Sequence, residues 1–130
     1  MTMQSGKFGW NELATTDTDA AAAFFGTVLG WTRQTVPSPT GQGEYHLFLN
    51  GEEQVAGMMA MDGPEWQGIP PHWLSYVMVE DIDGTTAKVQ SAGGRVLNGP
   101  FDIPGIGRMA VISDPTGATL ALMTPTDPPA

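Results

Sequence analysis

The sequence predicts an α+β fold made of two modules, each running strand, helix and then three strands. Three observations support this: the order of the elements, two similar helix starts, and a repeat of that order. An offset of 64 residues places Thr16–Asp19 on Glu80–Asp83 and Leu29-Gly30 on Gly93-Gly94. One βαβββ module leaves a sheet face bare, so pairing two modules in one domain is physically sensible.

The first module is expected over about residues 8–60 and opens with a strand at 8–15. Thr16 can cap the helix that follows, with Asp19 completing a variant of the capping box, and Gly30 is a natural C-cap. Asn50-Gly51 predicts a tight hairpin. Three further strands are expected, at residues 31–36, 44–50 and 53–59.

A segment rich in proline and glycine, about residues 61–71, is expected to link the modules. The second module, about 72–124, opens with a strand at 72–80 that is apolar on both faces and therefore buried. Asp81 then opens a helix that continues to about Ala92. The last strands are expected at residues 95–97, 108–113 and 118–124.

The composition limits the function classes. A chain of 130 residues that is 41% hydrophobic can bury a core without a disulfide or a structural metal. The net charge is −9 and the five basic residues are scattered, which argues against nucleic acid and anionic membranes as partners. Cysteine is absent, so thiol catalysis and cysteine-bound metals are excluded. Met1–Gly9 does not resemble a signal peptide, and a cytoplasmic protein is expected.

Several short motifs, in this order and spacing, resemble the glyoxalase, bleomycin-resistance and extradiol-dioxygenase (vicinal oxygen chelate) superfamily. They are Thr15-Thr16-Asp17, Phe24–Trp31, Pro71-His72-Trp73, Glu80–Asp83 and Asp114–Gly117. The resemblance covers about residues 8–124. It implies an eight-stranded, curved, mixed sheet around a cavity, a small-molecule ligand and a homodimer, with the modules paired within one chain or swapped between chains.

Metal-dependent members of that superfamily use up to four ligands, usually His, Glu or Gln, in the first and last strands of each module. The matching positions in this chain hold Trp10, Leu74, Ala121 and, in the first module, Ala56 or Gly57. None of these side chains offers a lone pair to a divalent cation. The resemblance therefore implies that this chain has no metal at the usual site, and no cofactor is expected.

A two-residue period places Trp10 and Glu12 on one face of the first strand. Similar periods on the other strands indicate an aromatic and methionine-rich cavity of the kind that binds small molecules. The alternative is a closed core filled by the same side chains. The expected ligand-binding residues are Trp10, Glu12, His46, Trp66, His72, Leu74, Tyr76, Met78, Ala121 and Met123.

Glu12 and His46 are the candidate catalytic residues. A carboxylate on a mostly apolar strand is costly to bury unpaired, so a cavity-facing Glu12 would act as a base or bind a cationic ligand. Alternatively, Glu12 pairs with an arginine or a backbone donor. His46 is either a polar contact or general base in the cavity, or a histidine satisfied within the core.

The leading functional prediction is a metal-independent small-molecule-binding protein. One alternative is a lyase, isomerase or dioxygenase with a displaced metal site built from His72, Glu12 and His46. Another is an interaction protein whose cavity is filled by its own side chains.

Overall fold

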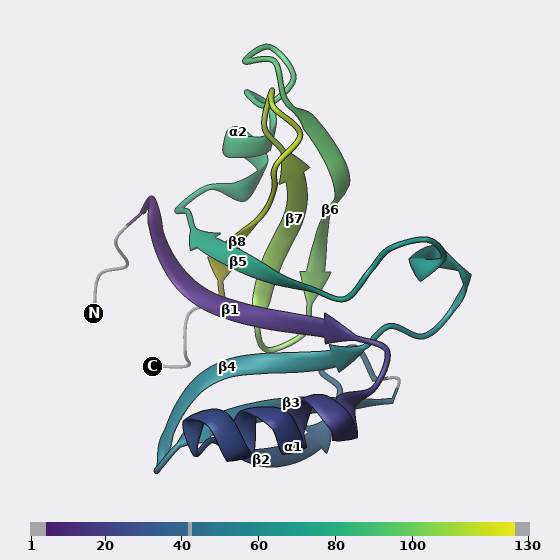
Figure 1. The fold of residues 1–130 in the computed structure, drawn as a ribbon. Coiled ribbons are helices and arrows are strands. Elements are labelled where there is room, and N and C mark those ends of the chain that lie inside the picture. The colour runs from purple at the N-terminus through teal and green to yellow at the C-terminus, as the bar shows by residue number, and fades with distance from the viewer. Residues whose placement is uncertain (1–4, 42, 127–130) are drawn as a thin grey trace. The chain divides into compact units, whose positions relative to one another are not determined.

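The computed structural model describes residues 5–41 and 43–126 and confirms the α+β class (Figure 1). Its elements follow the predicted order of strand, helix and three strands, twice. The strands form an eight-stranded mixed sheet in the order β2-β3-β4-β1-β5-β8-β7-β6. The chain divides into two compact units. The module-one unit is Trp10–Leu74, and the module-two unit is the chain from Ser75 onward together with the residues before Trp10.

The elements of the first half match the predicted ranges to within two residues. They are β1 (Lys7–Thr15), α1 (Thr18–Leu29), β2 (Thr32–Pro37), β3 (Glu44–Asn50) and β4 (Glu53–Ala60). The N-cap of α1 is Asp17 and not Thr16, because Asp17 is the extended residue whose carboxylate accepts a hydrogen bond from the Ala20 N–H at 3.0 Å. Gly30 is the C-cap, in the left-handed conformation that glycine adopts without strain.

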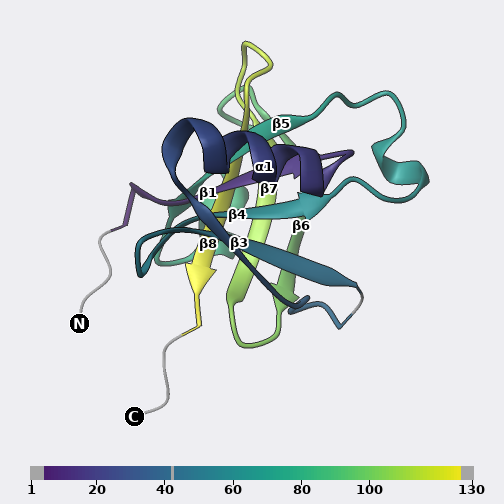
Figure 2. The same ribbon diagram turned by 60° about the horizontal axis from the view of Figure 1, so that its bottom comes forward.

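In the module-one unit, β1 runs parallel to β4, and β3 is antiparallel to both β2 and β4. Helix α1 packs against this sheet (Figures 1 and 2). The buried residues beneath the helix are Leu13, Phe48, Ala56 and Met58. Phe25 and Trp31 extend this core, with ring centroids 5.7 Å and 5.3 Å from Phe48. One face of the sheet is therefore occupied by α1.

The second half repeats the arrangement. Its elements are β5 (His72–Met78), α2 (Ile82–Thr86), β6 (Arg95–Ile103), β7 (Gly107–Ser113) and β8 (Thr119–Pro125). The N-cap Asp81 has φ −135° and ψ 92°, nearly the values of Asp17, 64 residues earlier. Helix α2 ends at Thr86, earlier than predicted, because the N–H groups of Lys88 and Val89 bond three residues back, to the carbonyl oxygens of Thr85 and Thr86, and so leave the four-residue pattern of an α-helix. Residues 87–93 continue as hydrogen-bonded turns.

In the module-two unit, β5 and β8 are parallel, whereas β7 is antiparallel to β6 and β8. The core on the α2 side consists of Val79, Ile82, Ala110 and Leu122. The expected linker contains only a short 3-10 helix, η1 (Pro64–Trp66). No helix in the described ranges has both the length and the apolar character needed to cross a membrane.

Candidate functional site

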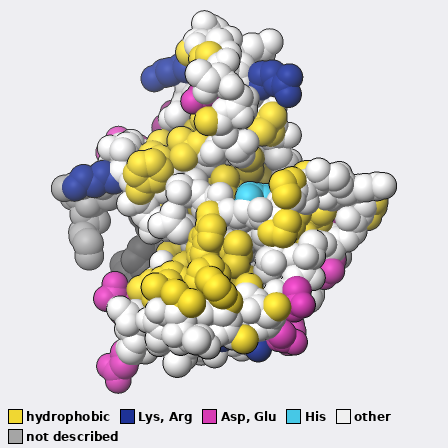
Figure 3. Space-filling view, viewed as in Figure 1, with side chains coloured by type: hydrophobic (Ala, Val, Ile, Leu, Met, Phe, Trp, Pro, Cys, Tyr) yellow, Lys and Arg dark blue, Asp and Glu magenta, His cyan; other side chains and the backbone are white. Residues whose placement is uncertain are grey.

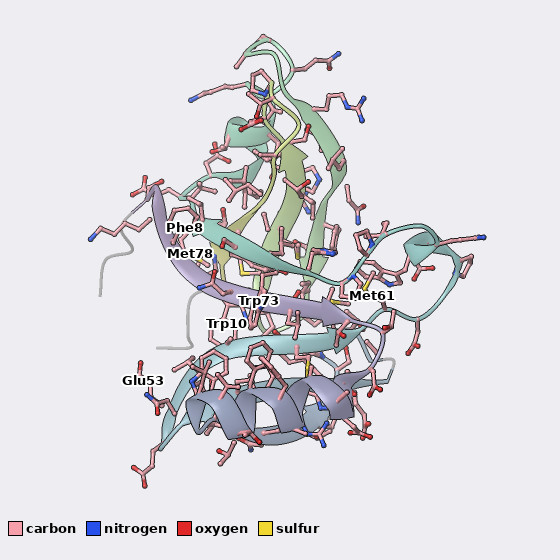
Figure 4. The ribbon with its side chains drawn as sticks, viewed as in Figure 1. Phe8, Trp10, Glu53, Met61, Trp73 and Met78 are labelled. Carbon is pink, nitrogen blue, oxygen red and sulfur yellow. The ribbon has the colours of Figure 1, made fainter. Side chains whose placement is uncertain are left out.

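The module-one sheet has a second face, opposite α1, and this face carries the candidate site. Along β1, Leu13 packs under α1, so the period of two turns Trp10 and Glu12 to the opposite face. Along β4, Ala56 and Met58 pack under α1, so Gly57 between them faces the same way as Trp10. Figure 4 labels Trp10 on β1, the strand that pairs with β4.

Three side chains on this face form a hydrogen-bonded chain. The Trp10 Nε1–H donates to the Tyr45 hydroxyl oxygen at 3.2 Å, and that hydroxyl donates to Glu12 Oε2 at 2.7 Å. All three side chains are half-buried, neither sealed in a core nor fully in water. Together with Gly57, these residues are called the Tyr45 centre.

The protonation of Tyr45 follows from its surroundings. Burial and the adjacent negative charge of Glu12 raise the pKa of Tyr45 well above its usual value near 10. The phenol therefore stays protonated at physiological pH and remains a hydrogen-bond donor to the carboxylate. Its distance of 2.7 Å is typical of a hydrogen bond to a charged acceptor.

Gly57 makes room for this arrangement. It lies opposite Glu12 in the β1–β4 register, and a Cβ atom at this position would overlap the Tyr45 hydroxyl. The same Cβ atom would stand 3.1 Å from Trp10 Nε1. A glycine inside a strand often marks a close approach of this kind. The hydroxyl from β3 thus occupies the space that a side chain on β4 would fill.

The residues at the superfamily's ligand positions do not fit a divalent metal. The Trp10 indole nitrogen carries a proton that it donates to Tyr45, and Gly57 has no side chain. Ala121 offers only a methyl group. Within residues 5–41 and 43–126, no three His, Asp or Glu side chains are grouped to hold a metal ion. The structure thus does not assemble the displaced site of His72, Glu12 and His46.

His46 lies on the α1 side of the sheet, away from the Tyr45 centre. It is 7% exposed and shares its strand face with Phe48, two residues on. Its Nδ1 atom is 2.9 Å from Thr35 Oγ1 on β2. Burial, followed by the positive charge of Arg33, lowers the pKa of His46 below its usual value near 6.5. Its surroundings are those of a satisfied core histidine.

This lowered pKa predicts a pH-dependent stability. The unfolded chain takes up a proton at His46 first as the pH falls below about 6.5, so the free energy of unfolding drops between that pH and the native pKa. A single proton limits this slope to about 1.4 kcal/mol per pH unit. Urea denaturation across this range should show the slope in the wild type and lose it in H46Q. H72Q, which changes the other of the two histidines, should keep it.

The other expected ligand residues of the module-one unit lie near the start of β5. Trp66 packs on His72, with ring centroids 6.2 Å apart, and the His72 Nδ1 atom is 2.9 Å from the Pro70 carbonyl oxygen. Leu74 is half-buried on β5. Their contact with a ligand stays a separate hypothesis.

The remaining expected residues lie in the module-two unit, where they pack together. Tyr76 pairs with Ala121 in the β5–β8 register, and Met78 pairs with Met123. Tyr76, Ala121 and Met123 are all buried, and the Tyr76 hydroxyl is 4.0 Å from the sulfur of Met109. This burial resembles a filled core, unlike the half-buried Tyr45 centre.

Tyr45 and the role of Gly57 were missed by sequence reasoning. The strand segment 44–48 drew attention to His46, whereas its neighbour Tyr45 faces Glu12. An available signal was the isolated Gly57 within an apolar strand, because such a glycine predicts the close approach of a neighbouring group.

Comparisons of this chain with family models and with known proteins point to the same family. Residues 7–122 match the family model of the Glyoxalase/Bleomycin resistance protein/Dioxygenase superfamily. The chain is 41% identical over 122 residues to "Putative glyoxylase CFP32" of Mycobacterium tuberculosis, covering 94% of this chain. It is 35% identical over 124 residues to "Anthracycline biosynthesis protein DnrV" of Streptomyces peucetius, covering 87% of this chain. The chain spans about 45% of the length of these curated relatives.

Solved structures share the fold. Methylmalonyl-CoA epimerase from Mycobacterium tuberculosis is similar with a TM-score of 0.65 and 18% identity, covering 98% of this chain and 94% of that one. A hypothetical protein from Bacillus halodurans is similar with a TM-score of 0.67 and 14% identity, covering 98% and 99% of the two chains. At this level of identity the likeness concerns the fold alone.

Proposed function

Because the chain belongs to the glyoxalase/bleomycin resistance protein/dioxygenase superfamily, we propose that it is a metal-independent protein that binds a small molecule with an aromatic, apolar body. The ligand occupies the face of the module-one sheet opposite α1. Trp10 provides stacking area, and the Tyr45–Glu12 pair orients the ligand.

One observation carries this proposal: the Tyr45 hydroxyl is held between Glu12 and Trp10, over a glycine, in a half-buried setting. An ordered polar pair beside an aromatic side chain has the composition of a small-molecule site, in which a few fixed polar groups orient a mainly apolar ligand. The buried Tyr76, Ala121 and Met123 in the module-two unit support a packing role there.

Thermal shift with a panel of aromatic compounds tests the proposal. The panel includes an anthracycline, because DnrV is named for anthracycline biosynthesis. A binding compound at a hundredfold excess over its Kd should stabilise the folded chain by about 2.7 kcal/mol. W10A should lose this response, whereas W73A should keep it, because Trp73 packs on the α1 side against Phe25 at 5.6 Å.

Two results would contradict the proposal. Stoichiometric divalent metal, found by elemental analysis after purification without chelator, together with a ligand response that chelation abolishes, would favour a lyase, isomerase or dioxygenase. A panel that gives no thermal shift at all would favour an interaction protein with a filled cavity.

The proposal also includes a homodimer in the cytoplasm. Large apolar side chains of α1 are exposed, namely Phe24, Val28 and Leu29, and hydrophobic side chains gather over this helix in Figure 3. Exposed apolar patches of this kind support association. The absence of cysteine agrees with a reducing compartment, and the net charge of −9 argues against nucleic acid as a partner.

A further inference from the structure

We infer that two copies of this chain associate through the exposed side of α1, with the helix of one copy packed against the helix of the other. The inference rests on the homodimer in the proposed function, for which it names the contact surface, and it does not depend on the ligand-binding site. It is carried by the composition of α1, by a continuous patch of exposed apolar side chains, and by the lack of charge on that patch.

Helix α1 is apolar on both of its sides. Ala21, Ala22 and Phe25 pack toward the core of the module-one unit. The opposite side of a surface helix normally carries charged residues. Among the 12 residues of α1, all of which the structure describes, Asp19 is the only charged one. A helix that is hydrophobic all round is ordinarily buried, so the outer side of α1 has the composition of a covered surface.

The exposed apolar side chains on and beside α1 are continuous. They are Phe24, Val28, Leu29 and Trp73, which are 43% to 58% exposed and are called the α1 patch. Phe25 connects them, because its ring centroid is 5.1 Å from that of Phe24 and 5.6 Å from that of Trp73. Among the described residues, four of the nine exposed large apolar side chains belong to this patch. Figure 3 shows hydrophobic side chains gathered over the helix.

The size and shape of the α1 patch suit a contact with a second copy. Large side chains that are about half exposed present roughly 100 Å² each, so the patch presents about 400 Å², as apolar interaction sites do. This is about half of the surface that one partner contributes to a standard interface. The small Ala20, Ala23 and Thr27 are exposed beside it. They leave room for the bulky Phe24 and Val28 of a facing helix, so α1 is complementary to itself.

Charge and the length of the relatives both favour a second copy as the partner. The chain has a net charge of −9, so two copies repel each other unless their contact is uncharged. The α1 patch has no ionisable side chain, and Asp19 is paired with Arg33 at 2.8 Å. The match with the curated relatives covers about 45% of their length, so each of them has room for a second domain of this size.

Sedimentation equilibrium of the full chain tests the inference. The wild type should form a dimer with a dissociation constant of about 1 µM or lower, and added salt should not weaken this apolar contact. Phe24→Glu should raise the dissociation constant at least about a hundredfold, because it buries one unpaired carboxylate per copy. Val28→Glu, one helical turn on, should act in the same way. Both variants should keep the circular dichroism spectrum of the wild type, because both side chains are more than half exposed.

Phe8→Glu is the matched control. It makes the same exchange on β1, at a side chain that is 68% exposed, and should change the dissociation constant by less than about threefold. Cross-linking tests the contact directly, because the chain has no cysteine. A short bismaleimide should join two copies of A23C, whose thiol lies on the outer side of α1. It should leave S91C, with a thiol at an exposed position of the module-two unit, as single chains.

Several results would overturn the inference while the homodimer stands. They are a dimer that F24E and V28E leave intact, one that F8E weakens as much as F24E does, one that dissociates in added salt, or cross-linking of S91C without A23C. A wild type that stays monomeric at about a hundredfold higher concentration would overturn the inference and the homodimer together, and would leave α1 to a different partner. The ligand-binding part of the proposed function is tested separately, by thermal shift.

Discussion

Replacing Gly57 with alanine is expected to lower the free energy of unfolding by about 2–3 kcal/mol and to abolish ligand binding at the Tyr45 centre. The added Cβ atom would overlap the Tyr45 hydroxyl. Tyr45 must then swing away, which breaks its hydrogen bonds with both Glu12 and Trp10. Overpacking and the loss of the two hydrogen bonds both lower the free energy of unfolding.

Gly26→Ala is the matched control for this prediction. Gly26 lies inside α1, and its added Cβ atom would meet only the Trp31 carbonyl oxygen, at 3.4 Å. Alanine there should stabilise the chain by about 0.5–1 kcal/mol, because glycine is a poor residue in a helix interior. Urea denaturation measures both variants. Equal stabilities for G57A and G26A would show that Tyr45 does not depend on the space at Gly57.

Phe48→Ala should be the most destabilising single truncation in the module-one unit, with a loss of about 3–5 kcal/mol. Phe48 is 1% exposed, and its ring packs against both Phe25 and Trp31. Removing it leaves a cavity among side chains that belong to three different elements, so collapse to fill the space is limited. A loss of this size is a large fraction of the stability of an ordinary domain.

Phe24→Ala is the control. It also removes a phenylalanine ring, but Phe24, the neighbour of Phe25 on α1, has a side chain that is 57% exposed. At a protein concentration where the chain is monomeric, the loss in free energy of unfolding should stay below about 1 kcal/mol, since little apolar area leaves the core. Denaturation midpoints followed by tryptophan fluorescence compare the two variants. If F24A cost as much as F48A, the core would not be centred under α1 as the structure places it.

Most of the fold was predictable because its signals are local. Asp17 and Asp81 start the two helices, and Asn50-Gly51 marks the hairpin between β3 and β4. The length of β6 was not predictable, since Gly99 and Pro100 ordinarily end a strand. In the structure β6 continues through them to Ile103, with shifts of register against β7. The extent of such an irregular strand is determined by its pairing with β7, and its own sequence shows no clear strand pattern.

The candidate site was predictable only in part, because it depends on which face each strand presents. Alternation along β1 placed Trp10 and Glu12 together, and the structure agrees. On β3, Tyr45 and His46 are adjacent, so their side chains point to opposite faces of the sheet. The sequence did not show which of the two shares the face of Glu12. Sequence alone favoured His46 because histidine is the more common functional residue. The pairing of β3 with β4 beneath α1 turns Tyr45, not His46, toward Glu12.

Gly57 also bears on how this chain could change over time. A side chain at position 57 and the hydroxyl of Tyr45 require the same space. Introducing a metal-binding residue at 57 by one substitution would therefore displace Tyr45 before any other ligand was in place. A route to a metal site must alter both positions together or pass through a damaged intermediate. The two positions are therefore epistatic, because the residue at each restricts the substitutions that the other can tolerate.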